Sequence, residues 1–170
     1  QASIHMSGDG SGNGVDVSPD GKVWVTDQGN ARVLRFPASG STADLVLGQP
    51  NFVTGTVDPT ECSIGNTGTG ARLCHPKVVR YHAATNRLFV LDWRGTSMLD
   101  FDNAEYRILI YQKPATGDFT NGQAPAEVIR GKFGTLNDPF QCWTTSNPFC
   151  TRRLTGLELV PGKTNAFWLA

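Results

Sequence analysis

The residues best suited to hold a metal ion are three aspartates in the middle of the sequence. Asp92, Asp100 and Asp102 lie close together, and Asn103 and Glu105 add further oxygen donors. Calcium takes about six to eight oxygen ligands of this kind, but the spacing here does not match an EF-hand loop. A solvated acidic loop is therefore the competing interpretation, and calcium is the one cofactor that the sequence leaves open.

A catalytic constellation is not predicted. The histidines His5, His75 and His82 show no H-x-x-x-H spacing, and no serine lies in a G-x-S-x-G context. We therefore predict no catalytic residue. A non-enzymatic role is favoured, while an enzyme is left open.

Two pairs of cysteines each bracket a long segment between apolar stretches. Cys62 and Cys74 enclose one segment, and Cys142 and Cys150 enclose the other. Four cysteines allow three pairings, and this equivalent placement favours the two local ones. Closing a loop of about 13 residues stabilises a protein by roughly 3 kcal/mol in the chain-entropy model. The spacings do not fit a zinc knuckle, so the sequence predicts disulfides and an oxidising compartment.

Two tryptophans lie in segments that we expect to be loops. Trp93, followed by Arg94, begins an insertion, and Trp143 lies between two of the cysteines. Aromatic and arginine side chains in loops are frequent centres of binding energy. We therefore predict Trp93, Arg94 and Trp143 as binding residues for a protein or a glycan.

The elements that position these residues are β-hairpins. Apolar and polar residues alternate within residues 14–27, 78–92 and 156–170, which is the period of a strand with one polar face. Pro19 and Gly21 mark a turn, because proline presets φ and glycine accepts a positive φ. The sequence therefore predicts an all-β fold built from hairpins.

A polar motif follows two of the hairpins and leads into a third strand. Asp27, Asn30 and Arg32 precede one strand, and Asp102 and Arg107 precede the other with the same Asp-to-Arg spacing. A carboxylate at a strand end can accept backbone hydrogen bonds and pair with an arginine. We interpret these five residues as a structural repeat motif.

The recurring units are predicted to be propeller blades. A fourth strand is expected after each motif, at residues 43–48 and 126–131, and four-stranded antiparallel units are the blades of a β-propeller. Residues 14–36 resemble an NHL repeat, and the sequence Leu-Gly-Gln-Pro-Asn-Phe at 47–52 is similar to a tail of bacterial secreted NHL proteins. The resemblance implies an NHL-type propeller and leaves the activity open, because propellers host many unrelated functions.

The expected organisation is one partial β-propeller over residues 1–170. About two and a half blades are present, whereas the ring to which they would belong has about six. The insertion in the second blade is expected to form a protruding loop or a lengthened hairpin. The predicted segments are an N-terminal segment (1–12), a blade (13–52), a disulfide-held insert (53–75), a blade (76–131) with an inserted loop (93–102), a second disulfide-held insert (132–153) and the start of a third blade (154–170).

Charge and hydropathy limit the classes of partner. Fifteen basic residues balance fifteen acidic ones, so nucleic acid is not predicted as a partner, and no apolar run is long enough to span a membrane. We predict an extracellular, cell-surface or periplasmic module that binds a protein or glycan, or that further blades or subunits complete. The alternative is a metal-dependent hydrolase or lyase of the NHL-like kind with its site on other blades, for which Asp16 or Glu158 would face the axis.

Overall fold

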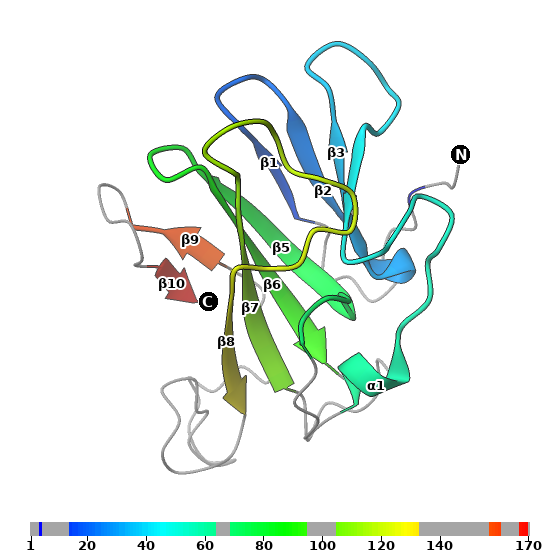
Figure 1. Ribbon diagram of the computed structural model, residues 1–170. Coiled ribbons are helices and arrows are strands. Elements are labelled where there is room, and N and C mark those ends of the chain that lie inside the picture. The colour runs from blue at the N-terminus through cyan, green and yellow to red at the C-terminus, as the bar shows by residue number, and fades with distance from the viewer. Residues whose placement is uncertain are drawn as a thin grey trace.

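The computed structural model shows an all-β architecture. It describes residues 4, 14–63, 69–94, 105–132, 157–160 and 167–169 of the chain. Two four-stranded antiparallel sheets and a two-stranded hairpin follow one another along the chain (Figure 1). The all-β prediction is confirmed for these residues, whereas a closed ring and the number of its blades stay predictions.

Each sheet has its strands in sequential order, as a propeller blade does. Blade 1 consists of β1 (Val15–Val17), β2 (Val23–Asp27), β3 (Arg32–Phe36) and β4 (Leu45–Leu47), with a 3-10 turn at Gln28–Asn30. Blade 2 consists of β5 (His75–His82), β6 (Arg87–Arg94), β7 (Glu105–Gln112) and β8 (Glu127–Lys132). The third hairpin pairs β9 (Leu157–Leu159) with β10 (Phe167–Leu169), and the short helix α1 (Pro59–Cys62) lies between the blades. No helix within the described ranges is long and apolar enough to cross a membrane.

The central hairpin of blade 2 is longer than that of blade 1. β6 and β7 stay paired beyond Asp92 and Arg107, as far as Arg94 and Glu105, whereas β2 and β3 stop pairing at the equivalent position. Of the two expectations for the insertion, the lengthened hairpin is confirmed at its base. The loop boundary predicted at residue 93 is wrong, because strand pairing continues through Arg94.

The blades share one pairing register, which gives each a front and a rear face. Trp24 of β2, Phe89 of β6 and Trp168 of β10 occupy the same position opposite the innermost strand of their unit. Side chains alternate between the two faces of a sheet. We call the face that carries Trp24 or Phe89 the front face, and the opposite face, with Val25 or Val90, the rear face.

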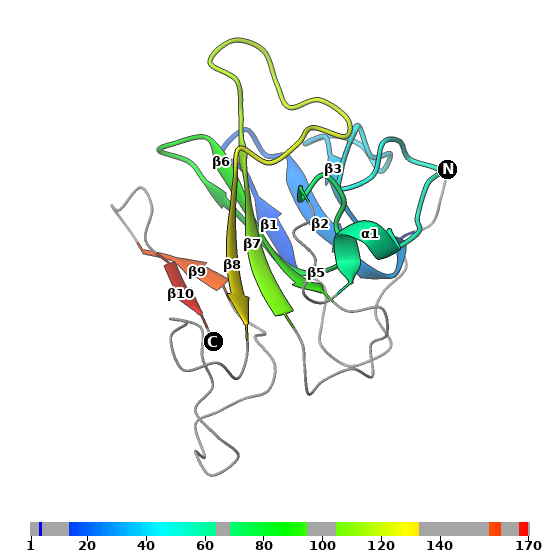
Figure 2. The ribbon, with the colours of Figure 1, turned by 60° about the horizontal axis from the view of Figure 1, so that its bottom comes forward.

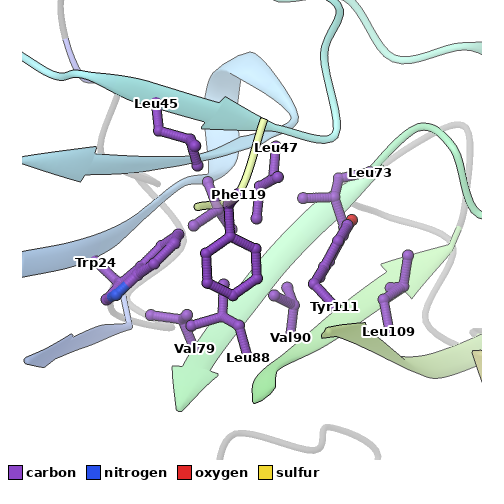
Figure 3. Close-up of a cluster of buried hydrophobic side chains, with 11 residues drawn as sticks. Trp24, Leu45, Leu47, Leu73, Val79, Leu88, Val90, Leu109, Tyr111 and Phe119 are labelled. Carbon is purple, nitrogen blue, oxygen red and sulfur yellow. The ribbon is translucent and has the colours of Figure 1, made fainter. Parts of the chain in front are cut away.

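The front face of blade 1 packs on the rear face of blade 2 (Figure 3). Phe119, from the β7–β8 connection, inserts between the sheets and meets Trp24 edge-on at 5.3 Å between ring centroids. Burial of each large apolar side chain contributes about 1.5–3 kcal/mol, so this cluster fixes the two blades to each other. It comprises Trp24, Val33, Leu45, Leu47, Leu73, Val79, Leu88, Val90, Leu109, Tyr111 and Phe119.

A second core repeats this packing one unit further along the chain. The front face of blade 2, with Phe89 only 1% exposed, packs on Leu157 and Leu159 of β9. Both contacts between units therefore join a front face to a rear face. The buried members of this cluster are Val78, Phe89, Leu91, Trp93, Tyr106, Ile108, Ile110 and Leu157.

Gly48, after β4, is required by both its backbone and its neighbour. Its φ is 80°, and a Cβ atom there would lie 2.5 Å from atoms of the buried Leu73 side chain. We expect Gly48→Ala to lower the free energy of unfolding by about 2–3 kcal/mol, measured by urea unfolding. Gly117→Ala is the control, because Gly117 has a φ of 91° but open space around the new methyl group. Equal losses in both variants would contradict the packing explanation.

Candidate functional site

A buried ion pair lies at one end of blade 1. Arg32 Nε donates to Asp27 Oδ2 at 2.6 Å, and both side chains are almost fully buried. Asn30 Nδ2 donates to the same carboxylate at 3.0 Å. Arg32 Nη1 also donates to the Phe52 carbonyl oxygen at 2.6 Å, so the pair fixes the segment that leaves β4. These contacts give the first copy of the repeat motif a structural role.

In blade 2 the partner of Arg107 is Asp92. Arg107 Nε donates to Asp92 Oδ2 at 2.9 Å, and neither side chain is exposed. The pairing of Arg107 with Asp102 expected from the spacing is therefore corrected. Asp92 holds in β6 the place that Asp27 holds in β2, and the spacing misled because the hairpin between Asp92 and Arg107 is longer. Asp102 lies outside the described residues.

The Asp92 carboxylate also organises the start of β5. It accepts hydrogen bonds from Cys74 N at 3.1 Å and His75 N at 2.8 Å. Asp100 and Asp102, the other two aspartates predicted to bind calcium, lie outside the described residues. Within the described part of the chain, no group of three or more His, Cys, Asp or Glu side chains is arranged to hold a metal ion. Calcium therefore stays a prediction.

The insert between the blades is closed by a disulfide bond. Cys62 and Cys74 form the predicted disulfide, with their Cα atoms 5.6 Å apart. Glu61, next to Cys62, accepts a hydrogen bond from Gly70 N at 2.9 Å across the same insert. Partial burial acts to raise the pKa of Glu61, but hydrogen bonds from Thr69 and Gly70 outweigh it and lower that pKa. Cys142 and Cys150 lie outside the described residues.

Arg94 holds this insert against the end of β6, where α1 lies (Figure 2). Its Nε donates to the Glu61 carbonyl oxygen at 3.1 Å and its Nη2 to the Ser63 carbonyl oxygen at 2.8 Å. Trp93 is 3% exposed and Arg94 is 2% exposed. The expectation that both lie in an exposed loop is therefore corrected, because β6 continues through them. Trp143 lies outside the described residues, and a binding role for the three stays a prediction.

The innermost strands β1, β5 and β9 are linked by polar side chains. Asp16 Oδ2 of β1 accepts a hydrogen bond from Tyr81 N of β5 at 2.6 Å. Arg80 Nε of β5 donates to Glu158 Oε2 of β9 at 3.4 Å. Asp16 and Glu158 are the two acids that would face the propeller axis in the alternative of a metal-dependent hydrolase or lyase. In the structure these two acids connect consecutive strands.

A charged cluster between the blades had no counterpart in the sequence prediction. Asp118, in the β7–β8 connection, accepts hydrogen bonds from Lys22 Nζ at 3.1 Å and Arg35 Nη1 at 2.8 Å, both from blade 1. Partial burial acts to raise the pKa of Asp118, but these two cations and the Phe119 N–H lower it overall. No local spacing could reveal the cluster, because Arg35 and Asp118 are 83 residues apart.

The inner strand of blade 1 leaves two apolar side chains open on its rear face. Val15 is 52% exposed and Val17 is 55% exposed. The residue of blade 2 equivalent to Val15 is Val79, which is 0% exposed because blade 1 covers it. The inner strand of this face is thus covered in blade 2 and open in blade 1.

The comparison with known families agrees with this architecture. The family model of the NHL repeat matches residues 13–36, which contain β1, β2, β3 and the Asp27–Arg32 pair. No curated protein matches the chain. The chain thus carries an NHL repeat at residues 13–36, within the first of its two blade-like sheets.

Proposed function

We propose that the chain is an extracytoplasmic interaction and assembly module of the NHL propeller type, in which the rear face of blade 1 receives a further blade. The NHL repeat and the stacked sheets support a protein-interaction or structural module. Protein or glycan binding by the rim loops belongs to the same proposal. An extracytoplasmic location is supported by the Cys62–Cys74 disulfide, because such bonds persist in oxidising compartments.

The observation that carries the proposal is the difference between equivalent faces. Every contact between units in the described structure joins a front face to a rear face, whereas Val15 and Val17 on the rear face of blade 1 are more than half exposed. The sheet that covers the rear face of blade 1 should therefore present a front face, with a large aromatic residue at the position equivalent to Trp24. Soluble proteins rarely leave a contiguous apolar sheet face in water.

No observation on the described residues specifically favours the alternative, a metal-dependent hydrolase or lyase. Asp16 and Glu158 accept hydrogen bonds from the neighbouring inner strand. A module that acts by contact needs only the faces and loops that the blades present.

Cysteine labelling tests whether the face is covered in the natural assembly. Val17→Cys lies on the rear face, and Val53→Cys is the control, because Val53 is 82% exposed and outside that face. In the isolated chain we expect both cysteines to react rapidly with a thiol reagent. In protein made by cells of the natural source, we expect Val17→Cys to react about tenfold more slowly than Val53→Cys, since labelling then needs local opening. Equal rates in that assembly would contradict the proposal.

A further inference from the structure

A small concave pocket lies at the end of blade 2 away from α1. It is formed where the β5–β6 turn meets the start of the β7–β8 connection, two segments that lie together in Figure 1. Its volume is about 420 Å³, within the range of small-molecule sites. The residues that line it are Asn86, Gln112, Lys113, Pro114, Ala115 and Gly117.

Gln112 forms a fixed wall of this pocket. Its Oε1 accepts a hydrogen bond from Arg87 Nε at 2.8 Å. Its Nε2 donates to the carbonyl oxygens of Thr85 and Lys113, each at 3.0 Å. Both ends of the amide are therefore committed, and Gln112 holds the turn and the connection together.

Two side-chain donors in the pocket are not used by the described residues. Asn86 Oδ1 accepts a hydrogen bond from the Tyr81 hydroxyl at 3.0 Å, which leaves Asn86 Nδ2 as the free donor of that amide. Lys113 Nζ has no acceptor within the described part of the chain, although its backbone N–H donates to the Asn86 carbonyl oxygen at 3.0 Å. The side chains that line the pocket thus offer a cation and an amide N–H, and none of them is an acid.

The neighbouring acid does not neutralise Lys113. Asp118 follows Gly117 in the chain, but its carboxylate pairs with Lys22 and Arg35 on the side of blade 1. The pocket therefore keeps one uncompensated positive charge. One such charge matches a carboxylate, whereas a phosphate monoester carries about −1.5 to −2 at neutral pH.

We propose that this pocket binds a small organic monocarboxylate, with Lys113 Nζ and Asn86 Nδ2 as donors to the carboxylate oxygens. Charge-assisted hydrogen bonds of this kind are roughly twice as strong as neutral ones. Pro114 and Ala115 supply the apolar wall for the body of the ligand. This site does not depend on the assembly face of blade 1.

The test is an NMR titration of the chain with three probes. Glucuronate and cyclohexanecarboxylate carry the charge on a sugar and on a non-sugar ring, and glucose is the neutral match for glucuronate. We expect the carboxylates to shift the amide signals of Asn86, Lys113 and Gly117, and glucose to leave them unchanged. Stronger binding of glucuronate would identify a sugar acid as the natural ligand class, and stronger binding of the other probe would identify a non-sugar acid. Equal shifts with glucose, or none with either acid, would overturn the proposal.

Matched variants separate recognition from folding. Asn86→Asp keeps the Tyr81 acceptor and tolerates the φ of 53°, but it replaces the donor by a negative oxygen. We expect it and Lys113→Gln each to weaken binding about tenfold or more, and Lys113→Arg to retain it. Thr42→Asp adds the same charge as Asn86→Asp at an exposed site in the β3–β4 loop and should leave binding unchanged. If Asn86→Asp alters the whole spectrum, its fold has changed, and the comparison of ligand binding by Lys113→Gln and Lys113→Arg then decides the assignment. Equal weakening in those two, or in Thr42→Asp, would overturn the assignment.

Discussion

Replacing Asp92 by alanine is expected to lower the free energy of unfolding by about 3–5 kcal/mol, the usual cost of leaving one partner of a buried ion pair without the other. Arg107 would remain fully buried without its hydrogen-bonded carboxylate, with Glu61 Oε2 left at 3.7 Å from its Nη1. The backbone N–H groups of Cys74 and His75 would lose their acceptor as well. Urea unfolding of the variant and the parent chain measures the loss.

Two further variants show how that loss of stability arises, one at the equivalent pair of blade 1 and one that removes both charges of blade 2. Asp27→Ala breaks the equivalent pair with Arg32 and should cost a similar amount, because both of those side chains are also buried. Asp92→Leu combined with Arg107→Met removes both charges and should recover part of the loss. The recovery stays incomplete because the backbone donors are still unsatisfied. A loss below about 1 kcal/mol for Asp92→Ala would show that the pair does not hold the blade together.

The strands could be predicted because their signal is local. Val15 and Val17 alternate with polar residues, and the proline and glycine of the first turn mark where the strand reverses. The Cys62–Cys74 bond could be predicted for a similar reason, since the two cysteines bracket one insert. The fold class therefore followed from patterns within single hairpins.

The contacts between elements could not be predicted in this way. The Asp92–Arg107 pair was missed because its hairpin is longer than that of blade 1, so equal spacing pointed to Asp102. Trp93 was assigned to a loop because the sequence does not show how far strand pairing continues. The pocket beside Lys113 depends on hydrogen bonds between two separate turns, and no motif in the sequence marks it.

Removing the disulfide with Cys62→Ala and Cys74→Ala together is expected to lower the free energy of unfolding by roughly 3 kcal/mol, because the bond closes a loop of about 13 residues in the unfolded chain. Urea unfolding measures the loss, and the parent chain unfolded under reducing conditions is the control without substitutions. The two should agree, apart from the small cavity that alanine leaves at two fully buried positions. A reduced parent as stable as the oxidised one would contradict the expectation.

The disulfide and Arg94 should act as one unit. Arg94 binds the carbonyl oxygens of Glu61 and Ser63, the residues on either side of Cys62, so both devices hold the same segment against β6. Arg94→Met alone leaves the insert tethered by the disulfide, and the cysteine variant alone leaves it bound by Arg94. Because the disulfide still holds the insert when Arg94 is lost, and Arg94 still holds it when the disulfide is lost, the two losses of free energy of unfolding should not simply add. We expect the triple variant to differ from their sum by about 0.5 kcal/mol or more. The rate of hydrogen exchange at the amides of Thr60 and Glu61 should rise most in the triple variant. If the losses of free energy of unfolding simply add, the disulfide and Arg94 stabilise the chain independently.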